Sequence, residues 1–456
     1  MSRTLAPAPP TSELRTIPGD FGLPWLGYTI PSIRDPLGFL RERYDRYGPV
    51  SWSGAFGNAT VLLLGPEACG IALTNPDKAF ANGPGWGFYI GQFFDRGLML
   101  MDGAEHLSHR RIMQQAFTNA RLGTYAQALQ PAIEAGIADW QPNPIFHVYP
   151  ATKKLTLDLA TSIFMGGAND RDVARMSRIN RAFIASVRAG TAYLRFPVPG
   201  GRWRRGLRGR ALLEEYLREY LPIRRAGDGD DLFTALCQIE SEDGERLTDA
   251  DIVNQMIFLL MAAHDTSTIT VSTMMGQLGQ HQDWQQRCRA ESLALGTAHP
   301  THAQLAELTS LDLVMKECLR LVAPVPSLAR KTVKDTEILG HFLPTGTMIT
   351  VSTHFTHHMR EYWPDPEKFD PERFSPARAE DKVHRFAWEP FGGGVHKCLG
   401  MYFSAIEIKS ILHQLLLRFD WSVPADYRTP LDYTALPYPK DGQPVNLIAR
   451  CGPGAP

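Results

Sequence analysis

The most specific pattern in this chain is one run near its end, Phe391-Gly392-Gly393-Gly394-Val395-His396-Lys397-Cys398-Leu399-Gly400. Its glycines let the backbone pass close to a bulky flat partner and adopt positive φ. The residues that follow, 401–417, have the pattern of a helix. A cysteine just before a helix lies in positive electrostatic potential, which favours its thiolate form. A thiolate beside a glycine-walled loop is what the axial ligand of a haem iron requires.

The spacing of this run resembles the haem-binding signature of the cytochrome P-450 family, the haem-thiolate monooxygenases. The matching pattern is Phe391-x-x-Gly394-x-x-x-Cys398-x-Gly400. A short motif of this kind also occurs by chance, and the alternative interpretation is a buried structural cysteine after a glycine loop. Three further motifs in the expected order favour the family. The resemblance extends over residues 17–452.

The resemblance implies haem b, iron protoporphyrin IX, as the cofactor. Cys398 is then the axial ligand of the haem iron, and a thiolate in that position favours cleavage of the O–O bond. Phe391, Gly392 and Gly400 belong to the same cofactor site. The fold that the family implies is mainly α with a minor β-sheet region. In that fold, the haem lies between a long distal helix and the proximal loop that carries the cysteine.

Composition and charge narrow the class of protein. The chain has 456 residues, of which 44% are hydrophobic, and a formal net charge of −1. This apolar content is sufficient for a large core, and the near-neutral charge indicates neither a nucleic acid nor an anionic membrane as partner. Six cysteines without paired spacing indicate a reducing compartment, with no disulfide framework and no zinc site.

The N-terminal residues contain neither the apolar core of a signal peptide nor a membrane-spanning stretch. We therefore expect a cytoplasmic protein without a transmembrane anchor, which resembles the soluble, bacterial type of the family. Residues 1–16 are expected to be a disordered tail, and residues 17–456 a single haem-binding monooxygenase domain. Within that domain, Pro36–Tyr47 has the pattern of an amphipathic helix, and 50–52 and 60–64 have the pattern of strands.

A long buried helix is predicted from a cap at Thr248 to about Gln280. The acidic residues after Thr248 suit the first turn of a helix, and residues 256–263 are apolar on all sides, which indicates burial. The polar run His264-Asp265-Thr266-Ser267-Thr268 follows. Buried polar side chains are costly unless they are satisfied or used. Helix hydroxyls commonly bond only the preceding turn, which is the alternative interpretation here.

In this context, Ala262-Ala263-x-Asp265-Thr266-Ser267 resembles the oxygen-activation motif of the family. The resemblance implies that the Thr266 hydroxyl bonds the bound oxygen and that Asp265 relays protons from solvent. These two are therefore the expected catalytic residues. One residue departs from the family pattern, because Ala263 stands where glycine is usual. A methyl group there would narrow the oxygen groove.

Glu317 and Arg320 lie three residues apart on one face of a predicted helix. Taken alone, such a pair is an ordinary surface ion pair that contributes little to stability. Together with Pro371-Glu372-Arg373-Phe374, it resembles the Glu-x-x-Arg motif of the family and the arginine that follows it later in the chain. The resemblance implies a buried structural triad of Glu317, Arg320 and Arg373 beneath the haem.

Basic residues in three places are expected to bind the haem propionates. His106 and Arg110 lie four apart on one predicted helical face, and the alternative interpretation is a solvated basic face. In the family this pair reaches a propionate, and Arg330 and His396 stand at the positions of further propionate donors. Arginine suits this task because its guanidinium presents a fork of hydrogen-bond donors.

The segment 78–102 is rich in glycine and aromatic residues, which predicts a long irregular loop. A packed surface loop is one interpretation, and by position the segment matches the substrate-covering loop of the family. The expected substrate-pocket residues are Trp86, Phe88, Tyr89, Phe93, Met261, Ala262, Val325 and Leu328. They suggest a sizeable hydrophobic molecule such as a sterol, terpenoid, retinoid or fatty-acid-like chain.

These motifs together favour a monooxygenase that inserts one atom of dioxygen into a hydrophobic small molecule. A peroxide-dependent peroxygenase is the near alternative, but such relatives depart from the acid–threonine pair that this chain keeps. A non-catalytic haem carrier or sensor would need no proton relay. The chain is too short for a flavin reductase beside the haem domain. The expected electron donors are therefore a ferredoxin and its reductase, which would dock near Arg111 and Lys397.

Overall fold

The computed structural model describes residues 5–55, 58–166, 173–190, 197–241 and 243–450. The chain forms two compact units. The first, the sheet unit, consists of residues 1–88, 316–398 and 431–437. The second, the helical unit, consists of residues 89–315, 399–430 and 438–456. A single domain over residues 17–456 stays a prediction.

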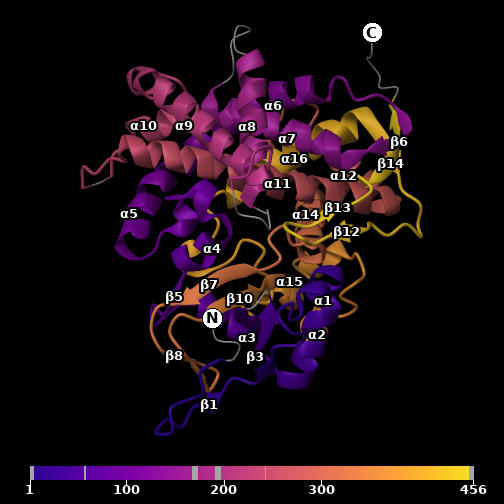
Figure 1. Ribbon diagram of the computed structural model, residues 1–456. Helices are drawn as coiled ribbons and strands as arrows, with labels where there is room; N and C mark the ends of the chain where they lie inside the picture. Colours follow the sequence, from indigo (N-terminus) through magenta and orange to yellow (C-terminus); the bar gives the residue numbers. More distant parts are fainter. Residues whose placement is uncertain (1–4, 56–57, 167–172, 191–196, 242, 451–456) are drawn as a thin grey trace. The chain divides into compact units, whose positions relative to one another are not determined.

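The sheet unit contains most of the strands (Figure 1). Its strands are β1 (Arg15–Thr16), β2 (Gly19–Asp20), β3 (Val50–Ala55), β4 (Asn58–Leu64), β5 (Phe80–Ala81), β7 (Leu328–Thr332), β8 (Thr336–Ile338), β9 (His341–Leu343), β10 (Met348–Ser352) and β12 (Leu431–Asp432). Its helices are α1 (Thr29–Arg34), α2 (Pro36–Tyr47), α3 (Pro66–Thr74) and α15 (Thr353–Thr356). Two helices have residues in both units, namely α4 (Gly83–Phe94) and α14 (Thr309–Leu321).

A six-stranded sheet forms the centre of the sheet unit, in the order β2-β3-β4-β10-β7-β5. Side chains alternate across β4 as the pleat requires. Val61 and Leu63 lie in one core cluster with α3, whereas Leu62 and Leu64 lie in another cluster with α2. The antiparallel register of β10 and β7 pairs Ile349 with Arg330 and so fixes the place of Arg330 in the sheet. The predicted helix Pro36–Tyr47 and both predicted strands are confirmed.

The structure departs from the expected disordered tail at the end of that segment. Arg15–Thr16 form β1, which pairs in parallel with His341 and Phe342 of β9. The Arg15 Nη2 group also donates a hydrogen bond to the Leu339 carbonyl at 3.0 Å. Pairing of only two residues with a strand more than 300 positions away leaves no local sequence pattern. Residues 1–4 lie outside the described residues.

The helical unit contains most of the helices (Figure 1). They are α5 (Gly103–Gln114), α6 (Asn119–Ile137), α7 (Val148–Met165), α8 (Val173–Gly190), α9 (Arg202–Ala226), α10 (Leu232–Gln238), α11 (Asp249–Gln280), α12 (Gln282–Ala294), α13 (His302–Glu307) and α16 (Met401–Arg418). Its strands are β6 (Asn143–His147), β11 (Phe419–Ser422), β13 (Tyr438–Pro439) and β14 (Pro444–Ala449), and β14 lies between β11 and β6 in a three-stranded sheet.

The helix α11 is the long buried helix that the sequence predicts. It has 32 residues and packs on α7, α9, α10, α12 and α16. The Thr248 hydroxyl oxygen accepts the Asp251 N–H at 3.2 Å, so the predicted cap is confirmed, as is the end at Gln280. In the described residues, no helix combines the length and the apolar character that crossing a membrane requires. The architecture is mainly helical with a minor sheet component, as predicted.

The prediction of an irregular loop over residues 78–102 is wrong, because most of the segment is helical. It contains α4 and a short 3-10 helix, Leu98–Leu100. The Trp86 N–H donates to the Asn82 carbonyl at 2.8 Å in the first turn. A Cβ on Gly85 would lie 2.7 Å from the Arg330 Cα, so at least this glycine is a packing position. The glycine content of this segment therefore led to the prediction of a loop where the chain forms the helix α4.

Candidate active site

Hydrogen bonds fix the backbone of the loop that carries Cys398, in the sheet unit. The Cys398 N–H donates to the Phe391 carbonyl at 2.9 Å, which closes the loop on itself. The Gly392 N–H donates to the Glu389 carbonyl at 2.9 Å, which forms the turn at its beginning. These two bonds define the path of the chain from residue 389 to the cysteine.

Two glycines of this loop have conformations that other residues adopt only with strain. The φ angles of Gly392 and Gly394 are 65° and 63°, in the left-handed region. A Cβ on Gly394 would lie 2.0 Å from the carbonyl oxygen of Leu73 in α3. The backbone of the loop therefore approaches α3 more closely than a side chain would allow, and the predicted use of glycine for close approach applies here to the protein's own chain.

Cys398 differs from the other described cysteines because it is exposed. The buried ones are Cys69, Cys237, Cys288 and Cys318. Among the residues that the structure describes, no group of three or more His, Cys, Asp or Glu side chains could hold a metal ion. A single accessible sulfur suits an iron whose equatorial ligands come from a porphyrin. The exposed sulfur of this loop therefore fits the axial position of a haem iron.

Phe391 and Gly400 flank the cysteine. The Phe391 ring lies edge-on to the Trp388 ring, with centroids 6.2 Å apart. Gly400 caps the N-terminus of α16, and its carbonyl oxygen accepts the Ser404 N–H at 2.8 Å. The predicted helix after the cysteine is thus confirmed, with its first residue at Met401.

The structure brings the predicted triad together in the sheet unit. Arg320 Nε and Nη2 donate to the two carboxylate oxygens of Glu317 at 2.7 and 2.9 Å, and both side chains are fully buried. Arg373 Nε lies 3.5 Å from Glu317 Oε1 and is also buried. Burial raises the pKa of Glu317, although its bonds to Arg320 and to the Asp370 N–H oppose the rise. The pair is not a surface ion pair.

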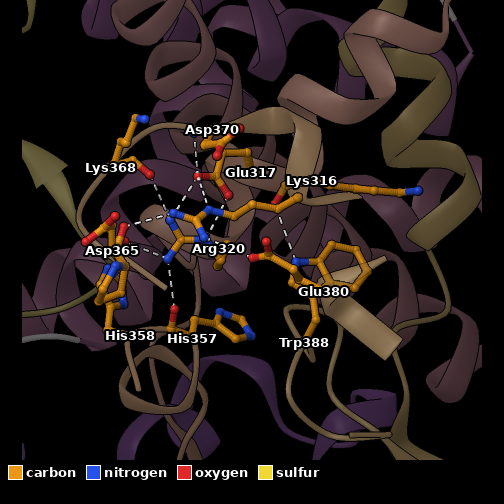
Figure 2. A network of polar contacts seen from close by, with 12 residues as sticks. Lys316, Glu317, Arg320, His357, His358, Asp365, Lys368, Asp370, Glu380 and Trp388 are labelled. Carbon is orange, nitrogen blue, oxygen red and sulfur yellow. Dashed lines mark hydrogen bonds and ion pairs between the residues drawn. The ribbon is translucent and has the colours of Figure 1, made fainter. Parts of the chain in front are cut away.

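Arg320 also holds backbone groups that the sequence did not indicate. Its Nη1 donates to the carbonyls of His357 and Pro366 at 2.9 and 2.7 Å, and its Nη2 donates to the Lys368 carbonyl at 3.3 Å. Figure 2 shows the Arg320 guanidinium between the Glu317 carboxylate and the carbonyl groups of His357 and Lys368. Because guanidinium presents five donors in a rigid plane, this one side chain joins three segments of the sheet unit.

The acid of the predicted catalytic pair is engaged in an ion pair within the helical unit. Lys153 Nζ of α7 lies 2.6 Å from Asp265 Oδ1, and His264 Nδ1 lies 3.3 Å from the same oxygen. Lys153 also donates to the Tyr149 hydroxyl at 3.4 Å. Burial lowers the Lys153 pKa, but the charges of Asp265 and Tyr149 and the hydrogen bonds to both side chains together raise that pKa above its ordinary value. The ammonium group is therefore retained in a partly buried position.

The hydroxyl of the predicted pair bonds its own helix. Thr266 Oγ1 donates to the Ala262 carbonyl at 2.8 Å, the bond that hydroxyls in helices commonly make. The next residue, Ser267, donates to Glu407 Oε2 of α16 at 2.5 Å. Glu407 is fully buried, and burial raises its pKa to about 7 although the Ser267 bond lowers it. A protonatable carboxyl group thus lies between α11 and α16.

The four expected propionate donors divide between the units. In the sheet unit, Arg330 is buried in β7, and His396 is half-buried in the 3-10 helix Gly394–His396. In the helical unit, His106 and Arg110 lie one turn apart on α5, with His106 buried and Arg110 half-buried. Their placement on one helical face follows from the spacing of four.

The expected substrate-pocket residues have different environments. Phe93 is buried and packs edge-on against Trp203 of α9, with ring centroids 4.8 Å apart. Phe88 and Tyr89 lie on the outer face of α4 with 48% and 43% of their surface exposed. The half-buried residues are Trp86 in α4, Met261 and Ala262 in α11, and Val325 and Leu328 before and in β7.

Sequence reasoning missed Lys153, Glu407 and His357. Lys153 lies on an amphipathic helix like any solvated lysine, so no local signal distinguishes it. Glu407 is different, because it interrupts the apolar pattern of α16, and a carboxylate among buried positions was a readable signal. His357 contacts the site through a ring nitrogen and a backbone carbonyl, and only the fold reveals both.

Comparison with known proteins gives a consistent result. A family model described as Cytochrome P450 matches residues 17–441. The chain is 48% identical to "Putative cytochrome P450 136" of Mycobacterium tuberculosis, over 98% of this chain and 92% of that protein. It is 30% identical to a Streptomyces melanosporofaciens protein named "Cyclooctat-9-en-7-ol 5-monooxygenase", over 90% of this chain and 91% of that protein.

A solved structure agrees with the sequence comparison. It is described as "Retinoic acid bound cyanobacterial CYP120A1", and its fold superimposes with a TM-score of 0.86 at 30% identity. The match covers 96% of this chain and 100% of the other. The predicted fold class is therefore confirmed, and with it the family's haem b cofactor and monooxygenase class. The chain belongs to the cytochrome P450 family.

Proposed function

We propose that this cytochrome P450 hydroxylates or otherwise oxidises a hydrophobic small molecule, with Cys398 as the axial ligand of the haem iron. The observation that carries the proposal is the exposed Cys398 thiol in a loop whose backbone is closed by the bond to Phe391. Bound haem supplies the activation of dioxygen. The chain's own residues hold the cofactor, deliver protons and exclude water.

Holding the cofactor falls to two groups of residues. The buried Glu317–Arg320 pair with Arg373 keeps the segments of the sheet unit rigid. The basic side chains proposed to bind the two propionates are His106, Arg110, Arg330 and His396. Arg330 and His106 are both buried, and Arg330 Nη1 donates a hydrogen bond to the Ala329 carbonyl at 2.8 Å.

Proton delivery falls to Asp265 and Thr266. The Asp265 carboxylate accepts a hydrogen bond from Lys153, whose side chain is one-third exposed and can exchange protons with water. Thr266 donates its own proton to the Ala262 carbonyl, so its oxygen is left able to accept another. In that state the hydroxyl oxygen can accept a hydrogen bond from a protonated donor, and the hydroxyl passes on its own proton only after it rotates away from the Ala262 carbonyl.

The proposed substrate is a terpenoid or retinoid of moderate size. Two similar proteins support this class, since one is named "Cyclooctat-9-en-7-ol 5-monooxygenase" and the other is described as retinoic acid bound. The half-buried Met261 and Ala262 on α11 supply apolar surface of the kind such molecules need. Phe88 and Tyr89 on the outer face of α4 are proposed to meet the substrate as it arrives.

The proposed electron donors are a ferredoxin and its reductase, acting on a cytoplasmic protein. Exposed Lys397 beside Cys398 and exposed Arg111 on α5 are candidate contacts for an acidic ferredoxin. Arg111 lies 3.8 Å from the exposed Asp243, a weak surface pair that a partner's carboxylate can replace. The scattered spacing of the six cysteines supports a reducing compartment.

One experiment tests substrate binding, turnover and the source of electrons. Purified protein is titrated with terpenoids, retinoids, sterols and fatty acids, and the absorption spectrum of the haem is followed for binding. Bound compounds are then incubated with a ferredoxin, its reductase and NADPH, or with peroxide alone. We expect an oxygenated product with the ferredoxin system. Product with peroxide only, across several ferredoxins, would instead favour a peroxygenase.

A further inference from the structure

His357 occupies an unusual position in the sheet unit. It follows α15 directly and is completely buried. Its backbone carbonyl accepts a hydrogen bond from Arg320 Nη1 at 2.9 Å. Its ring nitrogen Nε2 lies 3.0 Å from the backbone N–H of Glu389. One residue thus joins the Glu317–Arg320 pair to the chain that leads into the cysteine loop.

The chemistry of this contact defines the state of the ring. A backbone N–H is only a donor, so Nε2 must be the acceptor and carry no proton. The imidazole is therefore neutral, with its proton on Nδ1. Burial, together with the nearby His354 and Arg320, lowers the His357 pKa well below its ordinary value, in agreement with that state. The ring serves as a fixed acceptor.

The bond is the first in a short series that ends at the cysteine. The N–H of Glu389 bonds the ring, and the carbonyl of Glu389 accepts the Gly392 N–H at 2.9 Å. The Phe391 carbonyl in turn accepts the Cys398 N–H at 2.9 Å. The loop between these bonds contains glycines at positive φ, which supply little stiffness of their own. The contact of Gly394 with α3 fixes one point of the loop, and the position of its first turn depends on where residue 389 is held.

We propose that His357 is a positioning residue for the Cys398 thiolate. Its ring holds residue 389 at a fixed distance from Arg320, and the loop transmits that position to the sulfur. The proposal rests on the proposed role of Cys398 as haem ligand and adds a residue to it. The Glu389 N–H would otherwise be a buried donor without an acceptor, and the loop would shift to find one.

The test uses two substitutions that place an acceptor at different depths. In His357→Gln, the carboxamide oxygen reaches the place of Nε2, whereas in His357→Asn it stops near the place of Nδ1. Both variants bury a carboxamide group, so the general cost of that burial is common to both. A difference between the two variants therefore reports the position of the acceptor. His358→Asn is the matched control, since His358 is equally buried but its Nδ1 bonds the His354 carbonyl.

The readouts are made on the holoenzyme. One is the Soret band of the reduced, carbon monoxide-bound protein, which a thiolate ligand shifts to the red, and its rate of conversion to the unshifted form. The other is the midpoint potential of the haem. We expect His357→Asn to convert roughly tenfold faster than wild type, the factor that one lost hydrogen bond represents. His357→Gln and His358→Asn should stay near the wild-type rate and potential.

Equal conversion rates and potentials in both His357 variants would overturn the proposal. If His357→Asn yields no holoenzyme, His357→Gln decides alone, and a tenfold faster conversion in that variant contradicts a role for the ring acceptor. Failure of the proposed function looks different. In that case the wild-type protein itself would lack the red-shifted band, whatever residue stands at position 357.

Discussion

At the scale of single residues, the ion pair with Lys153 stabilises the Asp265 carboxylate in a partly buried position of the helical unit. Their side chains are 33% and 15% exposed, and the joined atoms are 2.6 Å apart. Exposed ion pairs contribute little to stability, whereas breaking a buried pair strands a charge. Lys154, the next residue, pairs with Asp158 on the exposed side of the same helix and provides a natural comparison.

Replacement of Lys153 by methionine should lower the free energy of unfolding by about 1–3 kcal/mol, because the Asp265 carboxylate loses its partner in a partly buried position. Lys154→Met should cost no more than about 0.5 kcal/mol. Urea denaturation of the two variants and wild type measures both values. Equal losses in the two variants would contradict the view that Lys153 stabilises Asp265.

Glu407 makes stability depend on pH in a direction opposite to that of a carboxylate whose pKa is lowered by an ion pair. Its pKa is raised from 4.5 to about 7 by burial, so the folded protein favours the protonated form. The stabilising effect is complete below pH 4.5 and is lost as pH rises to about 7, a change of roughly 3 kcal/mol. Relative to wild type, Glu407→Gln should therefore gain that amount between pH 4.5 and pH 7.5. Denaturant unfolding of both proteins across this range checks it, and a pH-independent difference would show that Glu407 is ionised when folded.

At the scale of elements, Arg320 connects α14 with the chain around residues 357–370. Its five hydrogen bonds to Glu317 and three backbone carbonyls need the planar fork of a guanidinium. Arg320→Lys keeps the charge but can replace only some of these bonds. It should destabilise the protein by about 1–3 kcal/mol, because buried carbonyl groups lose their hydrogen-bond donor while the ion pair with Glu317 keeps its charge.

Arg378→Lys is the control for that substitution. Arg378 pairs with Asp370 and Glu380 but is 38% exposed, so its replacement should cost about 1 kcal/mol or less. The two variants are compared by thermal unfolding and by haem content after purification. A loss at position 320 no greater than at position 378 would mean that the buried network does not hold these segments together.

The helices show which parts of the fold a sequence can predict. The bounds of α2 and α11 were predictable because Pro36 and Thr248 give clear starts and the apolar periodicity continues to the end. The helix α4 was not, because its glycines suggested a loop. At the site, the predicted triad was recognisable from motif order. The further partners of Arg320 could not be predicted, because they are backbone carbonyl groups and every residue has one.

At the scale of the whole molecule, buried histidines set a limit to stability in acid. In the sheet unit, His354, His357 and His358 are all buried, and burial lowers the pKa of each. The pKa of His354 falls from 6.5 to about 4. Its neutral form stabilises the fold above pH 6.5, and this contribution is lost as pH falls to about 4, roughly 3 kcal/mol for this residue alone.

Wild-type protein should therefore lose stability steeply between pH 6.5 and pH 4, and His354→Gln should lose less over the same interval. Urea unfolding at half-unit steps of pH measures both slopes. Because Glu407 acts in the opposite direction above pH 4.5, the acid slope of the Glu407→Gln variant should be steeper still. Identical slopes in wild type and His354→Gln would show that this histidine is already protonated in the folded protein.

The central claim is that the Cys398 sulfur binds the haem iron, and the reduced, carbon monoxide-bound spectrum tests it most directly. The measurement compares wild type with Cys398→Ser and with Cys237→Ser, whose buried thiol has a pKa raised to about 12 and is no thiolate. Wild type and Cys237→Ser should both show the red-shifted Soret band, and Cys398→Ser should lack it. A red-shifted band that survives in Cys398→Ser, or that is missing from wild type, would contradict the claim.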